Sequence, residues 1–162
     1  MTSQTHRWVA VERRETGRYT VRSARGAELE VSTSGEQAFT PVELLLAAIA
    51  TCTAADVDVV TARRAEAESF TALVEAEKVR DDGGNVLRDL RVTFDIRFPP
   101  GEAGDAARAV LPRALSVSHD RTCTVSRTVE AGTPVAVRLA DAGEHPAVDG
   151  PAGGEQAGGE QG

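Results

Sequence analysis

Two cysteines are the residues of this chain whose chemistry stands out. Cys52 and Cys123 are its only cysteines among 162 residues, and they stand 71 positions apart. That separation excludes a CxxC redox pair and a paired zinc-knuckle spacing. The N-terminal residues contain no apolar signal segment, so we expect a cytoplasmic protein, in which thiols are usually reduced. The two cysteines are therefore better candidates for reactive thiols than for a structural disulfide.

Each cysteine has both a structural and a chemical interpretation. Cys52 falls in an apolar stretch and could be a buried residue that packs like a small hydrophobe. Cys123 follows Thr122, a candidate helix N-cap, and unpaired backbone N–H groups and the helix dipole stabilise a thiolate at such a position. Arg121 could add positive charge there, although Cys123 could equally be an ordinary residue of a first helical turn.

Three titratable residues lie at spacings that suggest chemistry with these thiols. Glu43 is nine residues before Cys52, which on an ideal helix is about half a turn out of phase and roughly 13 Å away along the axis. Any contact between Glu43 and a thiol would therefore cross to another subunit. Asp56 shares the helical face of Cys52, and His119 lies four residues before Cys123. Their simpler interpretations are a capping-box glutamate, a solvated or hydrogen-bonded aspartate and a surface histidine.

The first elements that must position these residues are a strand meander and a helix. Alternating apolar residues separated by glycine-containing turns predict antiparallel strands at residues 8–14, 18–23 and 27–32. The sequence from Thr40 to Glu43 has the order of an N-cap, a first-turn proline and a capping-box acid, so a helix should begin there and run to about Arg64.

The rest of the chain predicts two longer strands and two helices. Strands are expected at residues 69–80 and 86–98, joined by a glycine-rich hairpin loop. Helices are expected at 102–118, bent at Pro112, and at 123–130, before a last strand at 135–139. This order predicts an α+β fold with antiparallel sheets packed on a buried central helix.

Charge and composition bound the domain and its partners. The chain has 18 basic and 25 acidic residues, and four of the acids lie after residue 141, where there is no Lys or Arg. The near balance of the remainder argues against a nucleic-acid surface, which needs clustered positive charge. Residues 142–162 are rich in Gly, Glu, Pro, Ala and Gln, so we expect one domain over residues 1–141 and a disordered acidic, Gly-rich tail.

The central helix predicts a homodimer. From Val42 to Ala50 only Glu43 is polar, and a helix that is apolar on all sides must be buried on all sides. A second subunit would supply the cover that one small domain lacks. This apolar run is far shorter than the roughly 20 residues that span a bilayer, so no membrane partner is expected.

These residues together resemble the OsmC/Ohr family. The stretch from Phe39 to Val57, FTPVELLLAAIATCTAADV, is similar to the central-helix motif [ST]-P-x-E-L-L-L-A-A-L-x-x-C-T-x-x-D-V of that family. The stretch from Arg121 to Arg127, RTCTVSR, resembles its second motif, C-x-V-S. The resemblance covers about residues 7–140, and the order of strands and helices also agrees.

The resemblance implies an intertwined homodimer and a cysteine-based, peroxiredoxin-like oxidoreductase that reduces organic hydroperoxides. Cys52 would attack the peroxide, Cys123 would resolve the product as a disulfide, and an external dithiol would reduce that disulfide, without metal or cofactor. The family's hydroperoxide reductases also use a Glu and an Arg. Their Glu directly follows the proline, where this chain has Val42, so Glu43 is the candidate for that glutamate. Arg18, which follows Gly17, is the candidate for the arginine. These departures place the chain in the broad OsmC-like branch.

Another function class remains open beside the peroxidase. An OsmC-like dimer without peroxidase activity could bind a small apolar molecule or sense oxidation. Hydrolysis by a Cys/His pair would instead need His119 to meet a cysteine together with an orienting acid. Two cysteines within disulfide reach of each other would favour the peroxidase, and two distant cysteines would favour the alternative.

Overall fold

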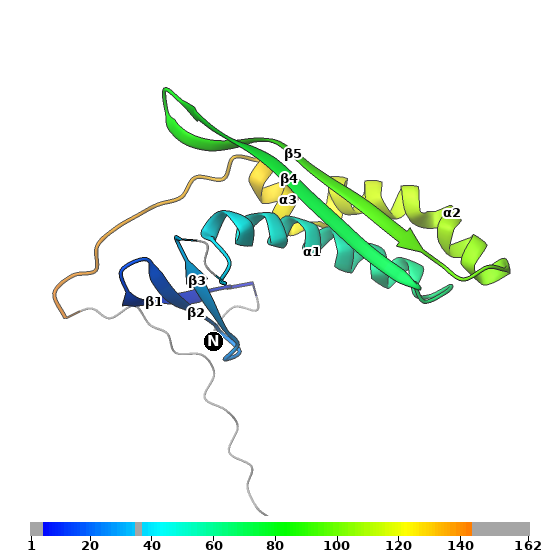
Figure 1. The fold of residues 1–162 in the computed structure, drawn as a ribbon, viewed down its shortest axis with the longest axis horizontal. Coiled ribbons are helices and arrows are strands. Elements are labelled where there is room, and N and C mark those ends of the chain that lie inside the picture. The colour runs from blue at the N-terminus through cyan, green and yellow to red at the C-terminus, as the bar shows by residue number, and fades with distance from the viewer. Residues whose placement is uncertain (1–4, 35–36, 144–162) are drawn as a thin grey trace, which may run out of the picture. The chain divides into compact units, whose positions relative to one another are not determined.

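The protein has two structural units, which we describe separately. A computed structural model describes residues 5–34 and 37–143 (Figure 1). Described residues up to Pro41 and from Ala136 onward belong to one unit, and Val42–Val135 form the other. The tail predicted to be disordered lies, from residue 144 onward, outside the described residues. The α+β class with antiparallel sheets is confirmed.

The first unit contains the predicted meander. Strands β1 (Val9–Glu15), β2 (Arg18–Ser23) and β3 (Glu28–Ser32) form an antiparallel sheet in that order. Val11 pairs with Val21, and Val21 pairs with Leu29, so the alternating apolar residues form one row across the sheet. Gly17 turns the first hairpin with a φ of 79°, a backbone conformation that residues with a side chain rarely adopt.

The strand predicted at residues 135–139 does not form, so that prediction is wrong for the single chain. The segment has no regular structure, and Val135, Val137 and Leu139 are 87–93% exposed. A strand is stable only where a neighbouring strand pairs with its backbone groups, and the described residues of this chain supply none there. Apolar residues do alternate in this segment, but the described residues contain no strand that pairs with it.

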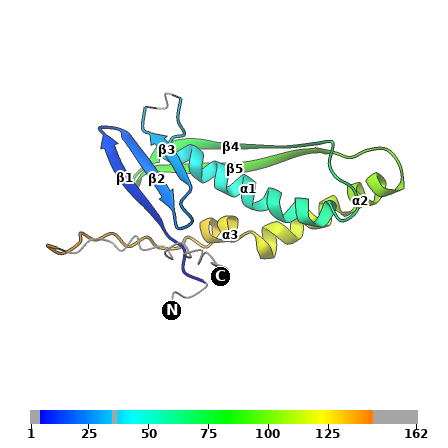
Figure 2. The ribbon, with the colours of Figure 1, turned by 90° about the horizontal axis from the view of Figure 1, so that it is seen from below.

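The second unit is built around helix α1 (Pro41–Thr61), which begins at the predicted proline and ends three residues earlier than expected. The hairpin of β4 (Ser69–Asp81) and β5 (Gly84–Arg97) runs alongside it (Figures 1 and 2). Cross-strand pairs carry the apolar face of the hairpin: Phe70 with Ile96, Ala72 with Phe94, and Val74 with Val92. The rings of Phe70 and Phe94 meet edge to face at 6.0 Å.

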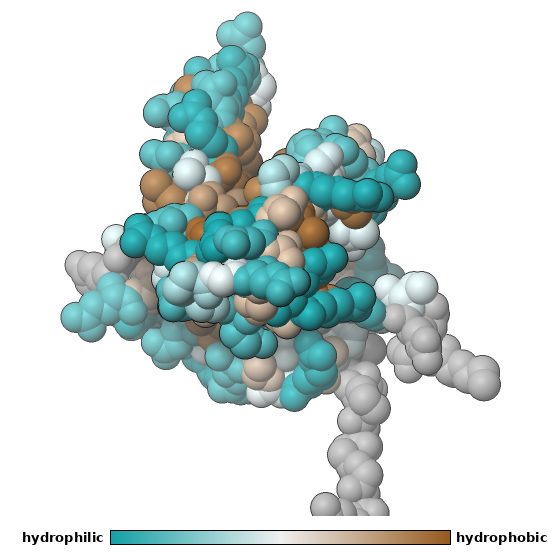
Figure 3. Space-filling view, turned by 90° about the vertical axis from the view of Figure 1, so that its right-hand side faces the viewer, coloured by the Kyte–Doolittle hydropathy of each residue, from teal (hydrophilic) through white to brown (hydrophobic). Residues whose placement is uncertain are grey.

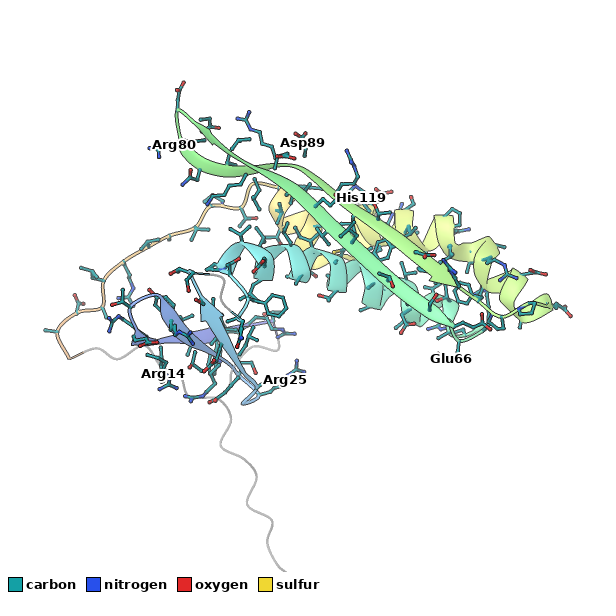
Figure 4. The ribbon with its side chains drawn as sticks, viewed as in Figure 1. Arg14, Arg25, Glu66, Arg80, Asp89 and His119 are labelled. Carbon is teal, nitrogen blue, oxygen red and sulfur yellow. The ribbon has the colours of Figure 1, made fainter. Side chains whose placement is uncertain are left out.

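The hairpin has an irregularity near its middle, and its strands stay paired from there to the turn. The register shifts between Glu75 and Glu77, and Asp89 on the opposite strand has a φ of 55°. Such a bulge adds a residue to one strand and increases the local twist. Arg80 and Asp89 mark the distal part of this hairpin in Figure 4.

The C-terminal helices of the second unit differ from the prediction at one joint. Helix α2 (Glu102–Val117) contains Pro112 without ending there. It continues into a π-helical segment, η1 (Ser118–Thr122), and only then into α3 (Thr124–Glu130). Cys123 is the N-cap of α3, whereas the sequence placed it in the first turn with Thr122 as the cap. As the N-cap, Cys123 accepts a hydrogen bond from the backbone N–H of Ser126.

Helix α1 is long and apolar enough, by length and composition, to cross a membrane, with a mean hydropathy of 1.7 over its most apolar window. The core helix of a soluble protein passes the same test. Polar residues of α1 contact other elements of its own unit: Asp56 accepts hydrogen bonds from Ser118 and Thr122, and Thr53 contacts Cys123. We therefore interpret α1 as a core helix.

Gly104→Ala is expected to destabilise the second unit, because Gly104 is buried in α2 and an added Cβ would overlap the carbonyl oxygen of Pro99. The loss should be about 1–3 kcal/mol or more. Since roughly 2–4 °C of melting temperature corresponds to each kcal/mol, thermal unfolding will detect it. Gly83→Ala is the control, because its new Cβ would meet only the flexible Asp81 side chain at 3.3 Å. Equal melting temperatures for the two variants would contradict this account of α2.

Candidate active site

The two cysteines lie together, although 71 positions separate them in the sequence. Cys52 on α1 and Cys123 at the start of α3 are free thiols that lie close enough for each to shift the pKa of the other. Cys52 is half-buried and Cys123 is completely buried. The junction of η1 and α3 thus brings the second cysteine to the middle of the central helix.

Three hydrogen-bonding groups surround the Cys123 sulfur. Because Cys123 caps α3, its Sγ accepts a hydrogen bond from the backbone N–H of Ser126 at 3.4 Å. The Ser126 hydroxyl lies 3.2 Å from the same sulfur, and the Thr53 hydroxyl donates to it over 3.6 Å. The neighbouring Cys52 thiol also acts on Cys123 and lowers its pKa. Together these groups can hold a negative charge on a sulfur that has no contact with solvent.

These contacts make the two thiols unequal in acidity. Burial opposes ionisation of Cys123, but its hydrogen bonds with Ser126 and Thr53 and the neighbouring Cys52 thiol outweigh burial and lower the pKa of Cys123 from 9.0 to about 7. The pKa of Cys52 is raised, chiefly by burial, and also by the neighbouring Cys123. Backbone N–H groups of Val125 and Thr124 act in the opposite direction on Cys52 without reversing the result.

Asp56 connects α1 to the segment that precedes Cys123. One of its carboxylate oxygens accepts hydrogen bonds from Ser118 at 2.7 Å and Thr122 at 2.6 Å, the first and last residues of η1. The backbone N–H of Cys123 in turn donates to the Ser118 carbonyl at 2.8 Å. The simpler interpretation of Asp56, a hydrogen-bonded aspartate at the middle of a helix, is the one that the structure supports.

The other predicted site residues lie away from the thiol pair or in the other unit. Glu43 is exposed in the first turn of α1 and lines a shallow hollow against β4 that contains Phe70 and Ala72. Arg18 lies on β2, where its side chain pairs with Glu15 at 3.2 Å. His119 pairs with Glu130 at 3.7 Å, and in the described part of the chain no hydrogen bond joins His119 to a cysteine. The Cys/His hydrolysis hypothesis therefore gains no support.

A largely apolar groove of about 630 Å³ lies close to Cys123, although neither cysteine lines it. Thr53 and Ser126, which both contact the Cys123 sulfur, form part of its wall. Its apolar lining comes from β5, α1, α2 and α3: Leu90, Val92, Phe94, Ile49, Leu115 and Val129. In Figure 3, hydrophobic side chains gather on the flank of the projecting hairpin that faces the helices. His119 marks the helix side of this region in Figure 4.

Sequence reasoning did not single out Thr53 or Ser126, although a signal was present. Ser126 stands three residues after Cys123, the spacing at which an N-cap side chain meets a backbone N–H of the first turn. Treating Cys123 itself as the cap would have identified that contact. Among the described residues there is no group of three or more His, Cys, Asp or Glu side chains that could hold a metal ion.

The chain matches the OsmC-like protein family over residues 33–138. Uncharacterized proteins of Mycobacterium tuberculosis and Mycobacterium bovis are 32% identical to it over 136 residues, which cover 82% of this chain and 96% of theirs. An OsmC-like protein of unknown function from Vibrio cholerae has a similar fold, with a TM-score of 0.65 at 16% identity, covering 78% of this chain and 95% of that one.

Two further solved structures share the fold: an OsmC-like protein from Mycoplasma pneumoniae and a hypothetical protein from Aquifex aeolicus. Their TM-scores are 0.62 and 0.63, with 16% and 18% identity. The two alignments cover 79% and 80% of this chain, and 89% and 91% of the matched chains. The fold and the thiol site thus define the class of protein. The chain belongs to the OsmC-like family.

Proposed function

We propose that this protein is a thiol-dependent peroxidase that reduces organic hydroperoxides through Cys52 and Cys123. The observation that carries the proposal is the closeness of two free thiols that are 71 positions apart in the sequence, since each shifts the pKa of the other. A peroxidase of this kind needs one sulfur to become a sulfenic acid and a second to trap it as a disulfide. An external dithiol then restores the two thiols by exchange.

Accessibility supports the assignment of roles. A hydroperoxide must reach the attacking sulfur, and Cys52 is half-buried whereas Cys123 is fully buried. Cys52 is therefore the attacking residue and Cys123 the resolving one. The apolar groove close to Cys123 favours an organic hydroperoxide over hydrogen peroxide, because its walls gain contact with an apolar substituent.

The assay that tests this function is consumption of an organic hydroperoxide in the presence of a dithiol, with hydrogen peroxide as the comparison substrate. We expect multiple turnovers with the organic substrate and a lower kcat/KM with hydrogen peroxide. Equal values would contradict the role of the groove, and no turnover with either would contradict the peroxidase.

The alternative function is an OsmC-like dimer without peroxidase activity, which binds a small apolar ligand or senses oxidation. The observation that favours it is again the groove, whose volume suits a small molecule. The closeness of the two thiols favours the peroxidase, because a binding pocket alone requires no second cysteine. The cytoplasmic location and the use of a cellular dithiol belong to the same proposal.

The proposed active form is a homodimer, and sedimentation at micromolar concentration tests it. Only five of the 21 residues of α1 are buried, although the helix is mainly apolar, and its Leu45 is 40% exposed. A second copy would bury such residues, and it would allow Glu43 to approach a thiol that its own helical phase denies it. We expect dimer mass without a folded monomer, whereas a stable folded monomer would contradict the proposal.

A further inference from the structure

We propose that a groove between helices α1 and α2 is a second binding site, which takes an amphipathic carboxylate: an extended apolar chain that ends in one carboxylate group. The groove has a volume of about 620 Å³, which is within the range of small-molecule sites. Its described lining residues differ from those of the groove close to Cys123. The proposal goes beyond the peroxidase function and does not depend on it.

One face of each helix forms a wall of this α1–α2 groove. Helix α2 returns along the C-terminal half of α1 in the opposite direction (Figures 1 and 2). At one end of the groove, Ser118 and Thr122 donate hydrogen bonds to Asp56. The lining residues recur at spacings of three and four, which places them on one face of each helix. They are Asp56, Val59, Val60 and Arg64 on the α1 side, and Val110, Arg113, Ala114 and Val117 on the α2 side.

The middle of the groove offers apolar surface to a ligand. Val59 is 58% exposed and Val117 is 41% exposed, and both line the groove. Covering such side chains removes apolar surface from water and is favourable. The α1 side runs from Asp56 to Arg64, a rise of about 12 Å for helical residues. An extended chain as long as that of decanoate matches this length.

The charged residues direct an anion to the end of the groove opposite Asp56. Arg64 and Arg113 both line the groove, and no ion pair engages either guanidinium among the described residues. Arg64 also donates to the Val60 carbonyl at 2.9 Å, which holds its side chain at the end of α1. The Asp56 carboxylate repels an anion from the other end. A bound carboxylate therefore meets the two arginines, and its apolar chain extends between the helices.

The same charges favour a carboxylate over a phosphate monoester. A guanidinium matches the planar geometry of a carboxylate and can donate two parallel hydrogen bonds to it. The C-terminal end of α1, close to Arg64, has a partial negative charge from the helix dipole. This partial charge and Asp56 offset part of the positive charge of the two arginines, so the groove suits a single negative charge better than two.

Isothermal titration calorimetry with decanoate tests the site on the full-length protein. We expect one decanoate to bind per chain. Decanol, which has the same chain without the charge, should bind at least about tenfold more weakly, the effect of losing a charge-assisted hydrogen bond. Hexanoate, which has the charge on a shorter chain, should also bind at least about tenfold more weakly because it buries fewer CH₂ groups. An absence of saturable decanoate binding, or equal affinity for decanol, would overturn the proposal.

Two arginine variants locate the carboxylate. Arg113→Gln should weaken decanoate binding at least about tenfold, because it removes a charge that lines the groove. The Arg113 side chain is exposed, so the fold should tolerate the change. Arg63→Gln is the matched control, since Arg63 is also exposed, stands next to Arg64 and does not line the groove. Equal affinities of the two variants for decanoate would overturn the proposal.

Val59→Asp distinguishes a small ligand from a second copy of the chain. It places a negative charge in the apolar middle of the groove and leaves both arginines in place. We expect loss of decanoate binding with no change in sedimentation or melting temperature. Dissociation of a dimer by Val59→Asp, together with no decanoate binding by the wild type, would show that a second copy covers the groove and would overturn the proposal. Tighter binding of decyl phosphate than of decanoate would overturn the assignment to a carboxylate.

Discussion

Cys52→Ser is expected to abolish consumption of organic hydroperoxide, because it removes the sulfur that attacks the O–O bond. A serine hydroxyl ionises far too weakly at neutral pH to replace a thiolate, and Cys123 has no exposed surface through which peroxide could reach it. Turnover in the dithiol-coupled assay should fall to the rate measured without protein. The melting temperature should change little, since the substitution is nearly isosteric.

Cys123→Ser is the comparison that separates the two roles. It should still allow one oxidation per site, after which the unresolved sulfenic acid at Cys52 is exposed to overoxidation. Mass spectrometry should find a Cys52–Cys123 disulfide in the oxidised wild type and sulfinic acid at Cys52 in the variant. Sustained turnover by Cys52→Ser, or the absence of the crosslink in oxidised wild type, would contradict the two-cysteine mechanism.

The sequence predicted several regular elements well from local patterns alone. Strand β2 has the predicted limits, and α1 begins at the predicted Pro41. Local chemistry determines these features: alternation determines the strand, and a proline at the first helical position determines where the helix begins. The α+β class followed from the order of such elements, and local sequence carries that order.

The sequence failed where structure depends on contacts distant along the chain. Alternation at residues 135–139 predicted a strand, but pairing needs a neighbour, and the described part of this chain offers none. The π-helical η1 was also missed, because nothing in its local sequence distinguishes it from a continued helix. Its effect is to shift the start of α3 to Thr124 and make Cys123 the cap.

The sequence predicted the two cysteines of the candidate site but not their acidity. The two cysteines were identified by residue type and by resemblance to the family, but their relative acidity was not. Their relative acidity depends on Ser126, which reaches Cys123 once that residue caps α3, and on Thr53, whose hydroxyl reaches Cys123 only after α1 and α3 have packed together. The unequal thiols are therefore a property of tertiary structure.

Asp56→Ala is expected to reduce peroxidase turnover strongly by displacing Cys123, although Asp56 contacts neither sulfur through a described hydrogen bond. The substitution removes the acceptor shared by Ser118 and Thr122. Ser118 is completely buried, so its hydroxyl would lose a partner at a cost of about 1–3 kcal/mol. Because the N–H of Cys123 bonds the Ser118 carbonyl, movement of η1 is transmitted directly to the resolving cysteine.

The readout that identifies this positioning role is the rate of disulfide formation after Cys52 has been oxidised. Asp56→Ala should slow that step by at least about tenfold, since a loss of 1.4 kcal/mol in alignment is a factor of ten. Asp56→Asn should largely preserve it, because an amide oxygen can accept both hydroxyls in place of the carboxylate. Asp58→Ala, at an exposed site two residues further along α1, is the control for a general effect on the helix. If Asp56→Ala lowers the melting temperature but forms the disulfide at the wild-type rate, Asp56 stabilises the fold without positioning Cys123.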